Sequence, residues 1–193
     1  MRDRYLLATA TLVGTLAIVA CRKDAPTATR SAEPTAAAGA AAARHAARRP
    51  APGSVTLPPV GGFVSTLLAR GSFGDQINLM LRLEGDRGTD VVHVNDMGDM
   101  VMSRITIQPN NSLPWHTHPG PAFVTVTAGT LTVMDGDTCE ARMYGVGASF
   151  IDPGQGHVHV GYNGGSTEMV LYVTYVGVPA GTSPLIPTTN PGC

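Results

Sequence analysis

Short segments of alternating residues dominate the chain from residue 55 onward, and they constrain its fold more than any other feature. In residues 101–107, 123–127 and 130–134, apolar or β-branched residues alternate with others in a period of two. Further candidate strands are residues 150–151, 157–162 and 168–176. Because successive side chains of a strand point to opposite faces, this pattern indicates half-buried strands. Many such strands in succession predict an all-β sandwich or barrel.

The turns between these segments carry signals of their own. Asp135-Gly136 and Asn163-Gly164 are typical of tight two-residue hairpins, whose central positions need positive φ. Residues 76–83 are ambiguous, because their alternating Ile and Leu residues favour a strand but also allow a short helix. No sustained helical period follows residue 84.

The first 21 residues have the composition of a secretory signal peptide. Two arginines precede the uncharged, largely apolar residues 5–20, a run shorter than the roughly 20 residues that span a bilayer. The run ends in Ile18-Val19-Ala20-Cys21, which resembles the bacterial lipobox. That resemblance implies export and a lipid anchor on Cys21, and so a place in the cell envelope. The alternative is an ordinary signal peptide, an incidental cysteine and an extracellular protein.

The rest of the chain divides at residue 54. Residues 22–54, rich in Ala and Pro, are predicted to form a disordered tether, so His45 within them is not a candidate ligand. Residues 55–193 are predicted to be the folded domain. They carry five arginines against eleven carboxylates, and this acidic balance argues against a nucleic-acid partner.

Three cysteines are an odd number for an exported protein. Lipidation would use Cys21 and leave Cys139 and Cys193, which can pair in an oxidising compartment. The sequence therefore predicts a Cys139–Cys193 disulfide, with two free thiols as the alternative.

Four of the six histidines form two H-x-H pairs, His116 with His118 and His157 with His159. Residues i and i+2 of a strand share a face, so each pair can direct two imidazoles to one point. Neutral imidazole is a ligand for Zn, Cu, Fe and Ni. The two pairs therefore predict a metal site.

The spacing around these histidines resembles the two motifs of the cupin superfamily. The first motif, G-x5-H-x-H-x3,4-E-x6-G, has its counterparts at Asn110, His116, His118, Ala122 and Gly129. The second, G-x5-P-x-G-x2-H-x3-N, has its counterparts at Gly147, Pro153, Gly156, His159 and Asn163. The resemblance covers about residues 98–178. It implies a double-stranded β-helix, the jelly-roll barrel of cupins, with one divalent metal ion on His116, His118 and His159.

Three positions depart from these motifs. Asn110 replaces a glycine, and asparagine tolerates the left-handed conformation that such a turn can need. Pro153 and Gly156 are one residue further apart than expected. This spacing makes His157 an alternative to His159 as the metal ligand. Ala122 stands where the family's glutamate ligand is expected. Without that carboxylate, neutral imidazoles leave a divalent ion its full charge and open positions.

These observations lead to a secreted or envelope-anchored metal-binding cupin that acts on a small anionic or oxygen-rich molecule. If the protein is an enzyme, the resemblance implies metal-dependent, dioxygenase-like chemistry. The alternatives are a non-catalytic module that binds a metal or small molecule, and a metal-free barrel used for packing or dimerisation. His157 can be a fourth ligand, a base beside the site or neither. Fe, Mn, Zn, Ni and Cu are all candidates for the ion, and both a monomer and a homodimer are compatible with the sequence.

Lipidation of Cys21 can be tested by fractionating cells that express the full chain. We expect the wild type in the membrane fraction and Cys21→Ser in the soluble fraction, because the variant has no thiol to acylate. A wild-type protein that is wholly soluble and begins at another residue would contradict the lipobox interpretation.

Overall fold

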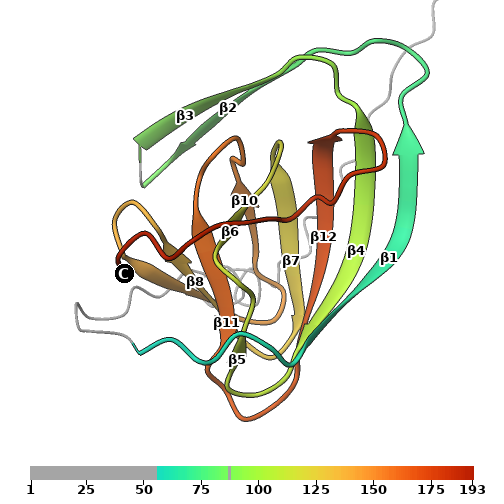
Figure 1. Cartoon of the computed structure of the whole chain (residues 1–193). Helices are drawn as coiled ribbons and strands as arrows, with labels where there is room; N and C mark the ends of the chain where they lie inside the picture. The colour runs from blue at the N-terminus through green and yellow to red at the C-terminus, as the bar shows by residue number, and fades with distance from the viewer. Residues whose placement is uncertain (1–55, 87) are drawn as a thin grey trace, which may run out of the picture. The chain divides into compact units, whose positions relative to one another are not determined.

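The structure, a computed structural model, describes residues 56–86 and 88–193, which form thirteen β-strands and no helix (Figure 1). The signal peptide, the tether and Cys21 lie outside the described residues. Within the described part of the chain, no helix could cross a membrane. In chain order the strands are β1 (Phe63–Ser72), β2 (Leu79–Gly85), β3 (Gly88–Val94), β4 (Asp99–Ile107), β5 (Asn111–Ser112), β6 (His116–Thr117), β7 (Ala122–Ala128), β8 (Leu131–Asp135), β9 (Ala141–Tyr144), β10 (Ser149–Asp152), β11 (His159–Asn163), β12 (Met169–Val178) and β13 (Ile186–Pro187).

Two antiparallel sheets and one hairpin make up the architecture. The first sheet has the order β1-β4-β12-β7-β10, and the second has the order β13-β6-β11-β8-β9, with β5 paired to β11. Among the described strands, β2 and β3 pair only with each other, and this hairpin lies above the barrel in the view of Figure 1. Consecutive strands such as β7 and β8 lie in different sheets, so the chain crosses repeatedly between the two. This is the predicted double-stranded β-helix.

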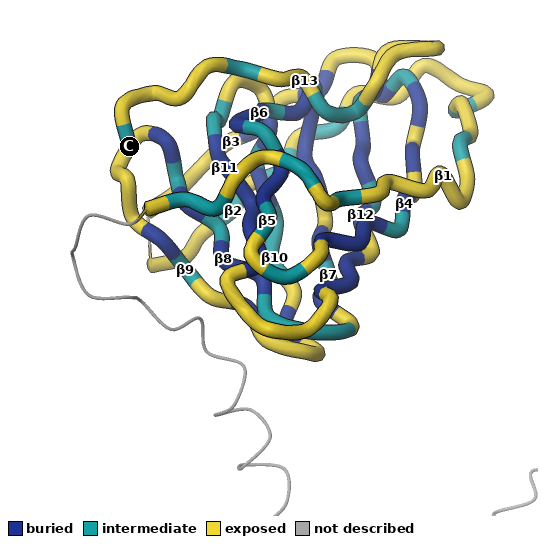
Figure 2. The backbone as a smooth tube through the Cα atoms, turned by 60° about the horizontal axis from the view of Figure 1, so that its bottom comes forward, coloured by how far each residue is buried: buried dark blue, intermediate teal, exposed yellow. Residues whose placement is uncertain are grey.

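The core lies between the two sheets, as the alternation of residues predicts (Figure 2). In β4, Val101, Ser103 and Ile105 are buried, whereas Met100 and Met102 are exposed. Inward side chains of both sheets form one apolar cluster, whose most buried members are Ile107, Ala122, Val126, Met169 and Val178. The ambiguous segment at residues 76–83 contributes to strand β2 and not to a helix.

Strand β1 ends the first sheet and is exposed along most of its length. It pairs with β4 on one side, and its register shifts between Leu67 and Ala69. Val64, Leu67 and Leu68 are about half exposed or more.

The last ten residues, which we call the C-terminal strap (residues 184–193), run along the second sheet. Strand β13 of the strap pairs with β6. Its end is fixed by a disulfide between Cys193 and Cys139, whose Cα atoms are 5.4 Å apart. This is the predicted pairing.

Neither predicted two-residue turn forms, although β8 and β9 do pair as a hairpin with a longer loop. Asp135 and Asn163 each end a strand, and a five-residue loop follows each of them. At the first loop Cys139, with a φ of 53°, is the residue in the left-handed region. The Asp135 Oδ1 atom accepts backbone N–H groups of the loop at 3.0 Å, so the side chain closes a wider turn. After Asn163 the chain crosses from one sheet to the other.

Asn163 is completely buried and joins three backbone groups. Its Nδ2 donates to the carbonyls of Ile107 and Thr167, and its Oδ1 accepts the N–H of Gly165.

Asn163→Ala leaves these groups without partners, so we expect a loss of about 2–3 kcal/mol in the free energy of unfolding. Urea denaturation measures it. Gln108→Ala, which removes an exposed hydrogen bond to Glu168, is the control and should change stability by less than about 0.5 kcal/mol. Equal effects of the two substitutions would contradict this role.

Candidate metal centre

Strand register brings three histidines together inside the barrel. His159 begins β11 and lies directly opposite His116 of β6, and His118 follows β6 by one residue. Their ring centroids are 4.3 Å apart for His116 and His159, 4.9 Å for His116 and His118, and 5.2 Å for His118 and His159. All three side chains are buried. One nitrogen of each ring lies within 4.8 Å of one nitrogen of both others.

Hydrogen bonds to the Nδ1 atoms of two of these rings define their orientation. Nδ1 of His116 donates to the carbonyl of Pro114, and Nδ1 of His118 donates to the carbonyl of Pro184, each at 2.8 Å. A carbonyl only accepts, so each Nδ1 carries the proton and each Nε2 keeps a lone pair. Metal-bound histidines in proteins are oriented by the same kind of contact.

Burial lowers the pKa of all three imidazoles. It brings the pKa of His116 to about 3, with a further contribution from His159. The pKa values of His118 and His159 fall to about 4 for the same main reason. The rings are therefore neutral at physiological pH, which is the form that binds a metal ion. Neutral imidazoles with inward lone pairs fit a divalent transition metal.

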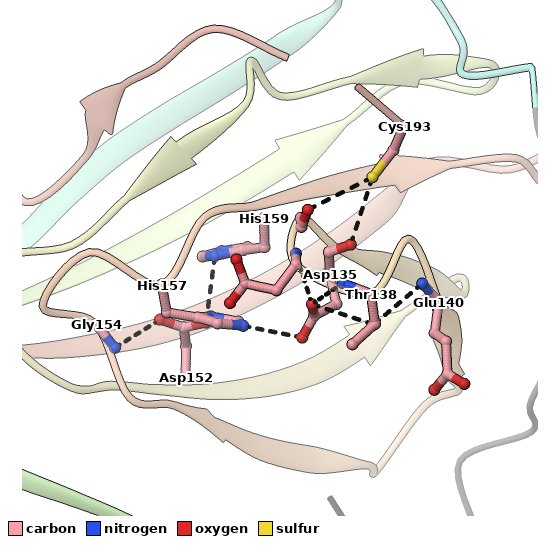
Figure 3. A network of polar contacts seen from close by, with 10 residues as sticks. Asp135, Thr138, Glu140, Asp152, Gly154, His157, His159 and Cys193 are labelled. Carbon is pink, nitrogen blue, oxygen red and sulfur yellow. Dashed lines mark hydrogen bonds and ion pairs between the residues drawn. The ribbon is translucent and has the colours of Figure 1, made fainter. Parts of the chain in front are cut away.

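His157 lies beside this group, between two carboxylates (Figure 3). Its Nδ1 donates to Asp152 Oδ2 at 2.7 Å, and its Nε2 donates to Asp135 Oδ2 at 3.0 Å. Burial disfavours the charged ring, but the two aspartates outweigh burial and raise the pKa of His157 to about 10. Burial also acts against ionised Asp152, yet the bond from His157 holds its pKa at about 2.

Asp152 connects His157 to the three-histidine group. Its Oδ2 atom lies 3.2 Å from Nδ1 of His159. That buried nitrogen makes no hydrogen bond to another described residue, so the contact is a close electrostatic one. Asp152, His157 and His159 form a second set of donors within 4.8 Å of one another. Because both ring nitrogens of His157 are taken up by aspartates, this second set is the weaker candidate for a metal ion.

The missing glutamate has a structural counterpart on the neighbouring strand. Ala122 of β7 is fully buried and lies opposite Asp152 of β10 and opposite Tyr175 of β12. Partners in antiparallel strands share a face, so all three side chains point into the barrel. The Tyr175 ring lies 5.1 Å from that of His118. A carboxylate beside the histidines thus comes from β10, and its Oδ2 atom lies close to Nδ1 of His159.

A small cavity adjoins the three rings. Its volume of about 30 Å³ corresponds to roughly two water molecules, since one water needs about 10–15 Å³ on this scale. Apart from the histidines and Tyr175, its lining is Ile105, Leu113, Val124, Leu131, Val133, Phe150, Gly161, Leu171 and Val173. The space therefore suits a molecule of two or three heavy atoms.

The sequence did not identify Asp152 or Asp135 as parts of the site. Asp135 stood out only as a hairpin signal, and Asp152 did not stand out at all. Because neither aspartate belongs to an H-x-H pair or to a motif of its own, the folded structure was needed to find them. His93, the remaining described histidine, is exposed and lies outside both donor sets.

The fold and the three-histidine group define a class of protein, a double-stranded β-helix with a candidate metal centre inside it. Residues 103–175 match the family model of the cupin domain. The matched segment runs from β4 to β12 and contains all three histidines. This match supports the predicted resemblance to the cupin superfamily. A comparison with curated proteins found no match.

Solved structures similar to this chain include the polyketide cyclase RemF from Streptomyces resistomycificus. It is 16% identical, with a TM-score of 0.44, over 76% of this chain and 84% of RemF. A cupin domain from Bordetella pertussis Tohama I is 16% identical, with a TM-score of 0.40, over 64% and 98% of the two chains. An oxalate oxidase is 23% identical, with a TM-score of 0.40, and the match covers 46% of each chain. The chain thus spans about half the length of that oxidase.

The charge on His157 predicts how stability depends on pH. Its pKa is about 10 in the folded domain and about 6.5 when unfolded, so its stabilising contribution is complete below pH 6.5 and is lost as the pH rises to 10. We therefore expect the stability difference between the metal-free wild type and His157→Gln to shrink over this range. Urea denaturation at several pH values measures it, with His93→Gln as the control for loss of an exposed imidazole. A constant difference between pH 6 and 10 would show that His157 is not held in its charged form.

Proposed function

We propose that this chain is a metal-binding cupin of the cell envelope or the extracellular space, and that it takes one divalent ion on His116, His118 and His159. The observation that carries the proposal is the state of the three rings, which are buried, neutral and close together, with Nδ1 of two of them bonded to backbone carbonyls. Each ring would then bind the ion through Nε2. His157 is excluded as a ligand in this proposal because its own nitrogens face aspartates.

A small anionic or oxygen-rich molecule is the proposed ligand of the centre. Three neutral ligands leave a divalent ion its full charge, and the bound metal would act as a Lewis acid toward an oxygen atom. The cavity limits the part of the ligand that reaches the ion to a few atoms. Tyr175 lines the same cavity, and its ring lies beside that of His118. For an enzyme, the cupin resemblance favours dioxygenase-like chemistry.

The second candidate is a non-catalytic module that holds a metal or a small molecule. The size of the cavity favours it, because a space for about two waters leaves little room for a substrate beside the ion. The two candidates differ in whether the metal keeps exchangeable positions.

Export is part of the proposal. The N-terminal 21 residues support it through their charge, apolar run and lipobox-like end. The disulfide between Cys139 and Cys193 is consistent with an oxidising compartment. Anchoring through Cys21 would attach the protein to a membrane without any spanning segment.

Titration of the metal-free domain with Co²⁺ tests the ligand set. We expect each of His116→Ala, His118→Ala and His159→Ala to weaken binding more than about 100-fold, because two histidines hold a divalent ion poorly. His157→Ala should cost only about 10–100-fold, the loss typical of a residue that orients a ligand. His93→Ala is the control and should bind like the wild type. Unchanged affinity in all three ligand variants would refute the proposal.

The same Co²⁺ complex separates the two candidates through its visible spectrum. An anion of three atoms such as azide should shift the absorption bands if open positions face the cavity. A spectrum that azide leaves unchanged would favour the closed, non-catalytic module.

A further inference from the structure

The C-terminal strap lies beside β6, the strand that carries His116 and that ends just before His118. In the pairing of β13 with β6, Pro187 is opposite His116. One residue later, the N–H of Thr188 donates to the carbonyl of Trp115 at 2.8 Å. The backbone on both sides of His116 is therefore held by the strap.

The strap also supplies the acceptor that orients His118. The carbonyl of Pro184 accepts from Nδ1 of that ring at 2.8 Å, across a separation of 66 residues in sequence. Movement of the strap would release the ring and allow its Nε2 to turn away from the other two. Two of the three candidate ligands thus depend on the position of residues 184–188.

Apolar burial fixes the strap only weakly. Ile186 is 44% exposed, and residues 188–192 are exposed or half-buried. Segments with few buried contacts open locally at low free energy. The covalent link from Cys193 to Cys139 is the strongest attachment between the end of the strap and the barrel.

The disulfide is also connected to the third histidine, His159, through the loop that carries Cys139. Cys139 lies in the loop that begins after Asp135, and Asp135 accepts from Nε2 of His157. His157 in turn holds Asp152 next to His159 (Figure 3). One bond therefore joins the strap to the loop that anchors this chain of charged groups.

On the basis of the metal site proposed above, we propose that the Cys139–Cys193 disulfide controls metal affinity. The three-histidine site then binds its ion tightly while the disulfide is formed, and weakly after reduction. Reduction by a trialkylphosphine breaks the S–S bond. Phosphorus is oxidised to the phosphine oxide with oxygen from water, and the two hydrogens of that water complete the two thiols. Such a site would load its metal after export and disulfide formation.

The test measures the Kd for Co²⁺ of the mature protein, oxidised and then reduced with the phosphine removed. We expect reduction to raise the Kd at least about tenfold, the lower end of the range for lost orienting contacts. Cys139→Ser/Cys193→Ser should match the reduced protein and be indifferent to the phosphine. Reoxidation should restore the original Kd. If the oxidised wild type fails to bind Co²⁺, the proposed metal site is wrong. Equal Kd values for the oxidised and reduced forms would overturn only the disulfide's role.

A second pair of variants keeps the disulfide and covers the case in which circular dichroism shows that reduction unfolds the barrel. Thr188→Pro removes the N–H that bonds to Trp115, whereas Thr188→Ala keeps it. We expect Thr188→Pro to weaken Co²⁺ binding at least about tenfold and Thr188→Ala to bind like the wild type. If both bind like the wild type, the strap does not position the ligands and the inference fails.

Discussion

The pairing of β11 with its neighbours is the constraint on which the candidate centre depends. His159 lies opposite His116 on one side and opposite Asp135 on the other. A slip of one residue would turn His159 to the other face of the sheet and bring a valine into its place. In this register Leu131 of β8 lies in the main core, and Met134 of β8 and Val160 of β11 pack together in the cluster that contains Trp115. Packing of the barrel and formation of the site therefore have the same cause.

Charge compensation explains why carboxylates are tolerated so close to the core. An isolated buried carboxylate is costly, but a charged histidine between two of them satisfies all three groups. Asp152 stays ionised next to His159 for this reason. The barrel thus keeps a negative charge within 3.2 Å of a candidate ligand without placing one at Ala122.

The sequence was a good guide to features that repeat or that match a motif. The period of two in residues 101–107 predicted which residues of β4 face the core, and cysteine counting predicted the Cys139–Cys193 bond. Asn110 has the left-handed backbone, with a φ of 54°, that its place in the cupin-like motif suggested. The predictions that failed concern side chains whose partners cannot be read from the neighbouring residues. Asp135 looked like half of a tight turn, yet its carboxylate closes a longer loop and binds His157, and neither contact leaves a local pattern.

In the part of the chain that the structure describes, the outer side of β1 has no partner strand. A strand at the end of a sheet presents unpaired N–H and C=O groups to which another extended chain can add. In β1 the shift between Leu67 and Ala69 interrupts the regular spacing of these groups. An incoming strand cannot stay in step with the whole of β1, even though Val64, Leu67 and Leu68 offer it apolar contacts. The irregularity therefore limits aggregation, which matters most when many copies are crowded on one surface.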